Sequence, residues 1–256
     1  MLIERMNDKY SADINFSLIS DNLLIYTLII CLCCGDTYAQ EFEVHYAGAL
    51  KNFKMKNDIS AKFDLQKLEG KSDLYALGAF ENLKGEIQIF NSVPYSTHAI
   101  DEKIVFDATF NKKASLLVYT QIPSWRALPI PENITSQSQL ETFIAQTATK
   151  SGIDARKPFP FLITGKAKGL SWHVIDWDEN DSVHSHQKHI ESGPNGHLEN
   201  IDIDVLGFYS DKHKGIFTHH TTNIHMHFII QDKTLAGHVD KLIPGATMHL
   251  KLPMVN

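Results

Sequence analysis

Residues 224–239, with the sequence IHMHFIIQDKTLAGHV, constrain the fold more than any other segment of the chain. His225 and His227 alternate with apolar residues, so a β-strand here would carry both imidazoles on one face. The polar residues 231–233 predict a hairpin turn, after which the chain returns to His238.

Two histidines two residues apart on a strand are separated by roughly 7 Å and can converge on one ion. A third histidine from the neighbouring strand would complete the arrangement of catalytic zinc, which has three protein ligands and one open position. The alternative is that the HxH pattern arises by coincidence in a histidine-rich region. We favour metal binding because another histidine follows on the predicted return strand.

Composition narrows the class of protein. The chain has 256 residues, of which 43% are hydrophobic and 21% charged, as expected for one large or two small globular domains. The formal charge of −6 provides no basic surface for nucleic acid and no polybasic membrane patch. Eleven of the 14 histidines lie between His184 and His249, which concentrates metal-ligating side chains in the C-terminal part.

The first 39 residues predict a signal peptide or an N-terminal anchor. Residues 23–34 form an apolar stretch that is too short for a comfortable membrane span. Thr37 and Ala39 then supply small residues at the −3 and −1 positions of a secretory cleavage site. We therefore expect an exported protein, periplasmic or extracellular, that is membrane-anchored if this segment is not cleaved. The segment also contains all three cysteines, Cys31, Cys33 and Cys34.

The rest of the chain is typical of a protein with many short strands. Residues 74–80 and 86–90 predict two strands joined by a turn, with Glu86 at the start of the second. Residues 136–150 predict the best helix, and Ser138 is its expected N-cap.

Two further segments allow sharper predictions. Residues 63–68 resemble a short amphipathic helix that ends near Gly70. Residues 176–200 are polar and rich in histidine, so either a second metal site or a solvated loop fits them. We favour the loop, because few apolar residues are present there to hold ligands rigid.

Several of these segments resemble the α-acetolactate decarboxylase family. Residues 78–86 (GAFENLKGE) are similar to that family's GTFnxLdGEm stretch, and residues 159–162 (FPFL) are similar to its YPPL segment. Residues 200–208, followed by the HxHF motif and the Gly237-His238 pair, match the order of its C-terminal motifs. The resemblance covers roughly residues 46–253.

The resemblance implies an α+β fold of two β-rich halves, with mixed or antiparallel sheets and few helices, that form a zinc site between them. The halves would comprise residues 40–165, which carry the family's active-site glutamate at Glu86, and residues 166–256. By motif position the zinc ligands would be His225, His227 and His238.

The resemblance also implies an activity, the decarboxylation of 2-acetolactate to acetoin and carbon dioxide, or of a close 2-hydroxy-3-oxo acid. Counting back from Lys157 places Lys150 where the family has an arginine, with Arg156 as a nearby alternative for this catalytic cation. Lysine keeps the charge but loses the bidentate fork of arginine. The expected partner is a small-molecule substrate, and a homodimer is compatible with the resemblance.

Two other functions stay open at this stage. One is an exported zinc-binding protein of the same fold without decarboxylase activity, which the surplus of histidines and the altered cation would favour. The other is a zinc hydrolase that uses Glu86 as the base toward a bound water.

Overall fold

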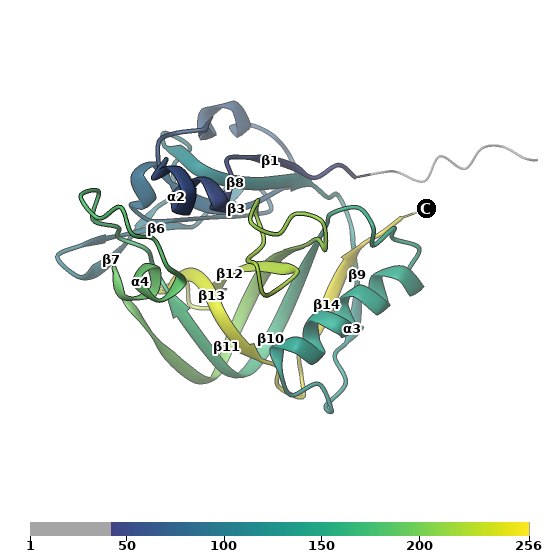
Figure 1. Cartoon of the computed structure of the whole chain (residues 1–256). Helices are drawn as coiled ribbons and strands as arrows, with labels where there is room; N and C mark the ends of the chain where they lie inside the picture. The colour runs from purple at the N-terminus through teal and green to yellow at the C-terminus, as the bar shows by residue number, and fades with distance from the viewer. Residues whose placement is uncertain (1–41, 256) are drawn as a thin grey trace, which may run out of the picture. The chain divides into compact units, whose positions relative to one another are not determined.

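Two antiparallel β-sheets form the framework of residues 42–255, the part of the chain that this computed structural model describes (Figure 1). The predicted signal peptide or anchor, residues 1–39, lies outside the described residues. The first sheet contains β1 (His45–Ala47), β2 (Phe63–Asp64), β3 (Leu74–Phe80), β4 (Glu86–Phe90), β5 (Val93–Pro94), β6 (Ser96–Ile100), β7 (Lys103–Asp107) and β8 (Lys113–Gln121). The second contains β9 (Trp125–Pro129), β10 (Phe159–His173), β11 (Asn195–Tyr209), β12 (Ile224–Ile230), β13 (Ala236–Ile243) and β14 (His249–Pro253).

Few helices accompany these sheets. The α-helices within residues 42–255 are α2 (Leu50–Lys56), α3 (Gln137–Lys150) and α4 (His186–Glu191), and two 3₁₀ turns are η1 (Leu65–Leu68) and η2 (Glu81–Leu83). None of the helices in this part of the chain has the length and apolar character needed to cross a bilayer. The predicted α+β architecture of two β-rich parts with few helices is therefore confirmed.

The first sheet is buried on both faces at its centre, where the strand order is β1-β8-β3-β4-β6-β7. Alternate residues of β3 enter different cores, as the period of two requires. Leu77 packs in the core between the two sheets, whereas Leu74 and Ala76 pack in a separate core on the outer face. The predicted pair of strands at residues 74–80 and 86–90 is confirmed as β3 and β4.

The second sheet closes on itself. Strand β10 pairs with β11, β11 with β12, β12 with β13, and β13 with the C-terminal part of β10, so these four strands form a ring of antiparallel pairs. Strands β14 and β9 extend the sheet from the N-terminal part of β10. The ring encloses a large apolar core, into which β12 directs Ile224, Met226 and Phe228. The opposite face of β12 is therefore free to carry its histidines toward the first sheet.

Helix α3 packs its apolar stripe against the core of the second sheet (Figure 1). Leu140, Ile144 and Ala148 on this stripe are fully buried. The helix was correctly predicted, but its N-cap is Ser136 rather than Ser138, because the Ser136 side chain accepts the hydrogen bond of the Gln139 amide. An N-cap oxygen satisfies an amide of the first turn, whereas Ser138 already lies within that turn.

Two other boundaries differ from the sequence-based expectation. Residues 63–68 are a short strand followed by the 3₁₀ turn η1 rather than one amphipathic helix, because the Asp64 side chain accepts from the Gln66 amide and starts the turn. The expected division between residues 165 and 166 falls inside β10, and β9 joins the second sheet. The two sheets therefore do not separate at that position.

The histidine-rich insertion, residues 176–200, is anchored to the first sheet rather than solvated along its length. Trp177 is buried in the core between the sheets, and its amide donates to the Leu83 carbonyl oxygen. The side chain of Lys84 pairs with Asp176, and His184 Nε2 lies 2.8 Å from Asn57 Oδ1. A single buried tryptophan thus supplies the rigidity that the polar composition did not predict.

Candidate metal centre

The hairpin of β12 and β13 brings three histidines together on the face directed at the first sheet. His227 is paired with His238 across the hairpin, and His225 lies two residues before His227 on the same face. One ligand atom from each of the three lies within 4.8 Å of the others, and all three side chains are buried. The structure therefore brings together the three residues that the sequence singled out as metal ligands.

Close approach of β10 completes this arrangement. His173, near the end of β10, pairs with His238 across the sheet, and its carbonyl oxygen faces Gly237. A Cβ atom on Gly237 would lie 2.6 Å from that oxygen, so a side chain at this position would push the strands apart. The glycine before His238 thus has a packing reason, which is the contact between β13 and β10.

The tautomer of His227 follows from its hydrogen bonds to Gln88 of β4. The Gln88 amide nitrogen donates to the Tyr95 carbonyl and to Thr97 Oγ1, which identifies its other atom, Oε1, as the acceptor. This oxygen lies 3.0 Å from His227 Nδ1, so Nδ1 carries the proton. The lone pair of His227 is consequently on Nε2, the nitrogen that faces the other histidines, as in metal-bound histidines whose second nitrogen donates outward.

The three histidines fit a divalent metal ion. His225 Nε2 lies 3.2 Å from His227 Nε2, close to the separation of about 3.3 Å between donor atoms in a tetrahedron with zinc–nitrogen bonds of about 2.0–2.1 Å. Burial, together with the neighbouring His238, lowers the pKa of His225 well below its usual range, and burial followed by His225 does the same for His227. Neutral imidazole is the form that binds a metal.

Glu86 faces this group from the first strand position of β4. Its Oε2 lies 3.6 Å from His227 Nε2, and its Oε1 accepts a hydrogen bond of 3.1 Å from the Ile175 amide. Burial raises the pKa of Glu86 to about 7, against the opposing influence of His238. A carboxyl group with such a pKa can hold or release a proton near neutrality, as a general acid or base must.

Sequence reasoning missed two neighbours of the triad, His173 and Asp240. Asp240 lies two residues after His238 on β13 and therefore shares its face. Asp240 Oδ1 lies 2.9 Å from His173 Nδ1. Burial acts to raise the pKa of Asp240, but His173 and His238 outweigh it and lower that pKa below its usual range. The alternation of His238 and Asp240 was a signal of their common face; nothing in the sequence pointed to His173.

The expected cations lie away from the histidines. Lys150 is exposed at the C-terminal end of α3, about 20 Å along the helix axis from Gln137 at its other end. It is Gln137, not Lys150, that bonds to β13, through the Leu242 amide. Arg156 is exposed and paired with Asp154. The structure therefore brings neither Lys150 nor Arg156 to the histidine triad.

Two hollows lie beside the triad, and both are lined by His225 and His238. A small cavity of about 40 Å³, here called the inner cavity, is lined by Glu86, His173 and His225, among others, and by no lysine or arginine of residues 42–255. An outer groove of about 630 Å³ shares His186 and His225 with it. Among the described residues, Lys241 is the one lysine or arginine that lines this groove. Histidine side chains therefore line both hollows, and Glu86 lines the smaller one.

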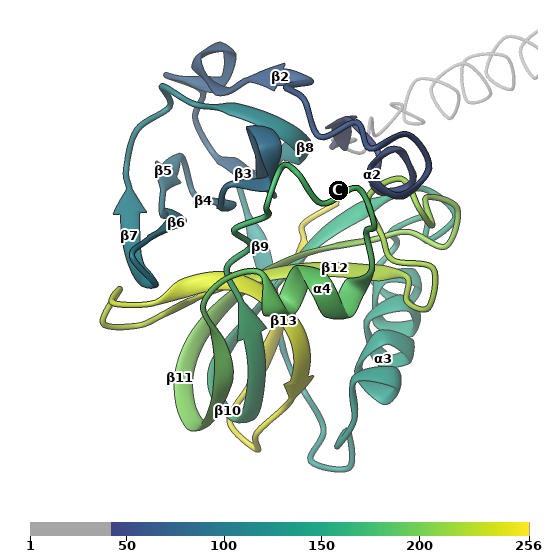
Figure 2. The ribbon, with the colours of Figure 1, turned by 60° about the vertical axis from the view of Figure 1, so that its left-hand side comes forward.

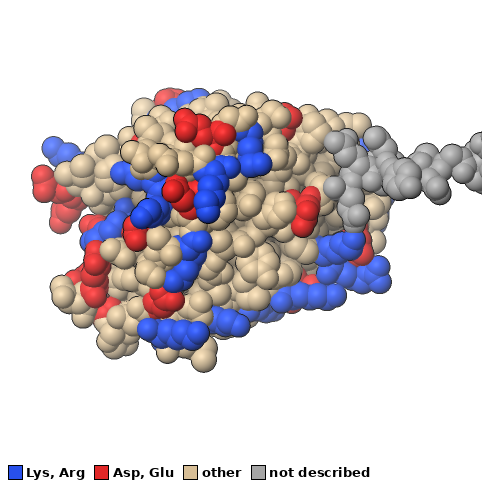
Figure 3. All heavy atoms as spheres, turned by 90° about the horizontal axis from the view of Figure 1, so that it is seen from above, with Lys and Arg blue, Asp and Glu red and all other residues tan. Residues whose placement is uncertain are grey.

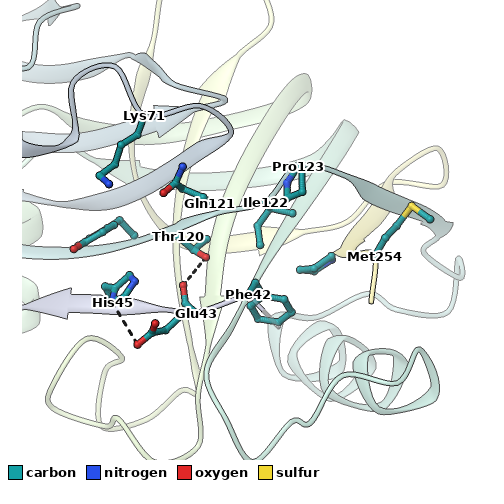
Figure 4. A pocket seen from close by; sticks show the side chains of 11 residues that line it. Phe42, Glu43, His45, Lys71, Thr120, Gln121, Ile122, Pro123 and Met254 are labelled. Carbon is teal, nitrogen blue, oxygen red and sulfur yellow. Dashed lines mark hydrogen bonds and ion pairs between the residues drawn. The ribbon is translucent and has the colours of Figure 1, made fainter. Parts of the chain in front are cut away.

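A separate pocket of about 250 Å³ lies at the edge of the first sheet (Figure 4). Figure 4 shows Glu43 in it, with ion-pair and hydrogen-bond contacts to His45 and Thr120. This pocket shares no residue with the histidine cluster. The face of the molecule in Figure 3 carries both basic and acidic side chains.

Solved structures share the fold of this chain. It is similar to a Staphylococcus aureus protein of unknown function described as similar to α-acetolactate decarboxylase, with 14% identity, a TM-score of 0.63, and coverage of 83% of this chain and 85% of that one. It is also similar to the α-acetolactate decarboxylase of Bacillus subtilis strain 168, with 15% identity, a TM-score of 0.62, and coverage of 84% and 85%. The acetolactate decarboxylase of Bacillus subtilis subspecies spizizenii gives 15% identity, a TM-score of 0.64, and coverage of 84% and 86%.

At this level of identity the solved structures establish the fold alone. No curated protein matches the chain. The model of the family described as α-acetolactate decarboxylase, however, matches residues 48–252, which include both Glu86 and the histidine triad. Because this match extends over most of the sequence, the chain belongs to the α-acetolactate decarboxylase family.

Proposed function

We propose that this protein is a zinc-dependent decarboxylase that converts 2-acetolactate, or a close 2-hydroxy-3-oxo acid, to acetoin or its analogue and carbon dioxide. The observation that carries the proposal is the buried triad of His225, His227 and His238, which faces Glu86 across the two sheets. Membership of the family supports the same reaction.

The side chains have distinct roles in this proposal. The three histidines hold the ion, and Gln88 keeps His227 in the tautomer that can do so. A bound zinc ion supplies Lewis-acid stabilisation of the negative charge that develops on the substrate oxygens. Buried Glu86, whose position is fixed by the Ile175 amide, stands on the same side of the cavity.

Glu86 supplies the proton that the reaction consumes. When the bond between the carboxylate and its carbon breaks, carbon dioxide leaves and the electron pair stays on the remaining fragment as an enediolate. Glu86 then delivers its carboxyl proton to that carbon and regains a proton from solvent, so each turnover consumes one proton. The raised pKa of Glu86, about 7, keeps a protonated fraction available at neutral pH.

The test is acetoin formation from racemic 2-acetolactate by the zinc-loaded protein. We expect turnover in the wild type and a loss on the order of 10²-fold or more in Glu86→Gln. His227→Ala should lose the zinc ion of the triad together with turnover, whereas His249→Ala, which changes an exposed histidine, should keep both. A zinc-loaded wild type without turnover on any 2-hydroxy-3-oxo acid would overturn the proposal.

One observation favours a second candidate, a zinc-binding protein of this fold without decarboxylase activity. A carboxylate substrate needs a cationic partner, and none of the lysines and arginines in the described part of the chain lines the inner cavity. The same assay separates the two functions, since a purely metal-binding protein would hold zinc tightly and form no acetoin.

The proposal also includes export, with cleavage after Ala39. N-terminal sequencing of the protein from its natural host should then begin at Gln40. A chain that retains residues 1–39 in a membrane fraction would instead support the anchor.

A further inference from the structure

One carboxylate oxygen beside the triad is surrounded by three imidazoles. Asp240 Oδ1 lies 2.9 Å from His173 Nδ1, 3.3 Å from His238 Nδ1 and 3.8 Å from His186 Nε2. Asp240 and His238 belong to β13, His173 to β10 and His186 to α4, so three separate elements converge on this point (Figure 2).

These three distances are close to the spacing between ligand atoms around one metal ion. Donor atoms at the corners of a zinc tetrahedron are about 3.3 Å apart, and the three distances around Asp240 lie on either side of this value. A carboxylate and imidazoles are ligands that zinc accepts together. His173, His238 and Asp240 also offer ligand atoms within 4.8 Å of one another.

An unpartnered nitrogen provides a second, independent observation. His238 is buried, and its Nδ1 has no hydrogen-bond partner among the described residues. A buried polar atom without a partner costs about 1–3 kcal/mol and calls for an explanation such as an ion or a water. This nitrogen points to the same location as the nitrogens of His173 and His186, namely Asp240.

We propose that Asp240, His173 and His238 bind a second divalent metal ion, zinc or a similar ion, beside the triad, and that His186 completes this site from α4. His238 lies at the border of the two sites, since it belongs to both groups of ligand atoms. The proposal adds His173, His186 and Asp240 to the residues of the triad. It goes beyond the decarboxylase function and does not depend on it.

The histidine-rich insertion contributes His186 to the second metal site. His186 is the first residue of α4 and half-exposed, and it also lines the outer groove, so an ion can reach it from solvent. The insertion that carries it is held by Trp177, whose ring stacks on His184 at a centroid distance of 4.3 Å. The second site is thus completed by a segment anchored on the first sheet.

The experiment counts bound metal. The metal-free full-length protein is titrated with Zn²⁺ by calorimetry, and the zinc retained after desalting is measured by mass spectrometry. We expect two equivalents in the wild type and one in His186→Gln, where the triad is untouched. His227→Ala should also retain one equivalent, because it removes a ligand of the triad only.

Matched controls exclude non-specific binding by surface histidines. His197→Gln and His249→Gln change exposed histidines outside both sites and should keep two equivalents. Circular dichroism checks that each variant is folded, and Asp240→Asn, which keeps the size of the side chain, provides a second removal of the site. We expect it to lower the stoichiometry as His186→Gln does.

Two results would overturn the proposal. One is a single equivalent in the wild type that is unchanged in His186→Gln. The other is two equivalents that persist in both His186→Gln and Asp240→Asn, since the second ion would then bind elsewhere. Failure of the decarboxylase assay would leave these counts unaffected, so the two proposals fail separately.

Discussion

Gln88 Oε1 and His227 Nδ1 lie 3.0 Å apart, and this contact joins the first sheet to the second at the metal centre. Because Gln88 is itself fixed by hydrogen bonds to Tyr95 and Thr97, the ring of His227 is held in one orientation and one tautomer. The first sheet therefore contributes two side chains to the site. Glu86 faces the histidine triad, and Gln88 orients the ring of His227.

Gln88→Leu should weaken zinc binding while it leaves all three ligands in place. The loss of an outer partner of a metal-bound histidine lowers affinity by roughly 10–100-fold. The measurement is a competition titration with a chromophoric chelator, with the exposed Gln66→Leu as the matched control. An affinity equal to that of the wild type would show that the contact does not orient His227.

Lys150→Ala should leave the kcat/KM for 2-acetolactate within about twofold of the wild type, because Lys150 makes no contact with the site. A lost interaction of about 1.4 kcal/mol would instead give a tenfold change. Steady-state kinetics test this, and Glu86→Gln serves as the variant in which activity is lost. A tenfold fall in Lys150→Ala would mean that the C-terminal end of α3 reaches the substrate.

Trp177→Ala should destabilise the protein by about 3–5 kcal/mol, as expected for truncation of a fully buried aromatic side chain. Its ring is 2% exposed and stacks on His184. Urea unfolding measures the change, and Val183→Ala, at a position that is 66% exposed, is the control with an expected effect near zero. Equal stability of the two variants would show that the insertion does not depend on this anchor.

Metal-free protein should lose stability in mild acid partly through His189. Burial, followed by the charge of His184, lowers the pKa of His189 from 6.5 to about 3. Between these two values the unfolded chain binds the proton and the folded chain does not, so the free energy of unfolding decreases as pH falls below 6.5. The loss from this one group is on the order of 2 kcal/mol at pH 5.

Unfolding of His189→Gln at pH 7.5 and pH 5 tests this linkage. The variant should lose less stability than the wild type between the two pH values, whereas the exposed His197→Gln should behave like the wild type. An identical pH dependence in His189→Gln and the wild type would contradict the assignment.

The parts of the fold that depend on local periodicity could be predicted from the sequence. The alternation of histidines with apolar residues predicted β12 and the face that carries its histidines. The helical spacing of apolar residues predicted α3. The N-cap was displaced by two residues because Ser136 and Ser138 are chemically equivalent until the chain direction into the helix is known. The ring of strands in the second sheet depends on pairings between distant segments, which no local pattern encodes.

The candidate site shows the same division. His225, His227 and His238 belong to one hairpin, so their convergence could be inferred from spacing, and the resemblance then added Glu86. Gln88 shares the face of Glu86 on β4 and could have been found by the same alternation. His173 comes from the end of β10 and His186 from the insertion, and only the three-dimensional contacts bring them to Asp240.

The ring formed by β10, β11, β12 and β13 has a consequence for the apo state. Each strand of the ligand hairpin is paired on both sides, and the apolar core of the ring is complete without any ion. In small zinc domains the metal is part of the scaffold, and the chain unfolds without it. Here the ion would bind to a chain that is already folded, so a chelator should abolish the activity while the tertiary structure stays intact.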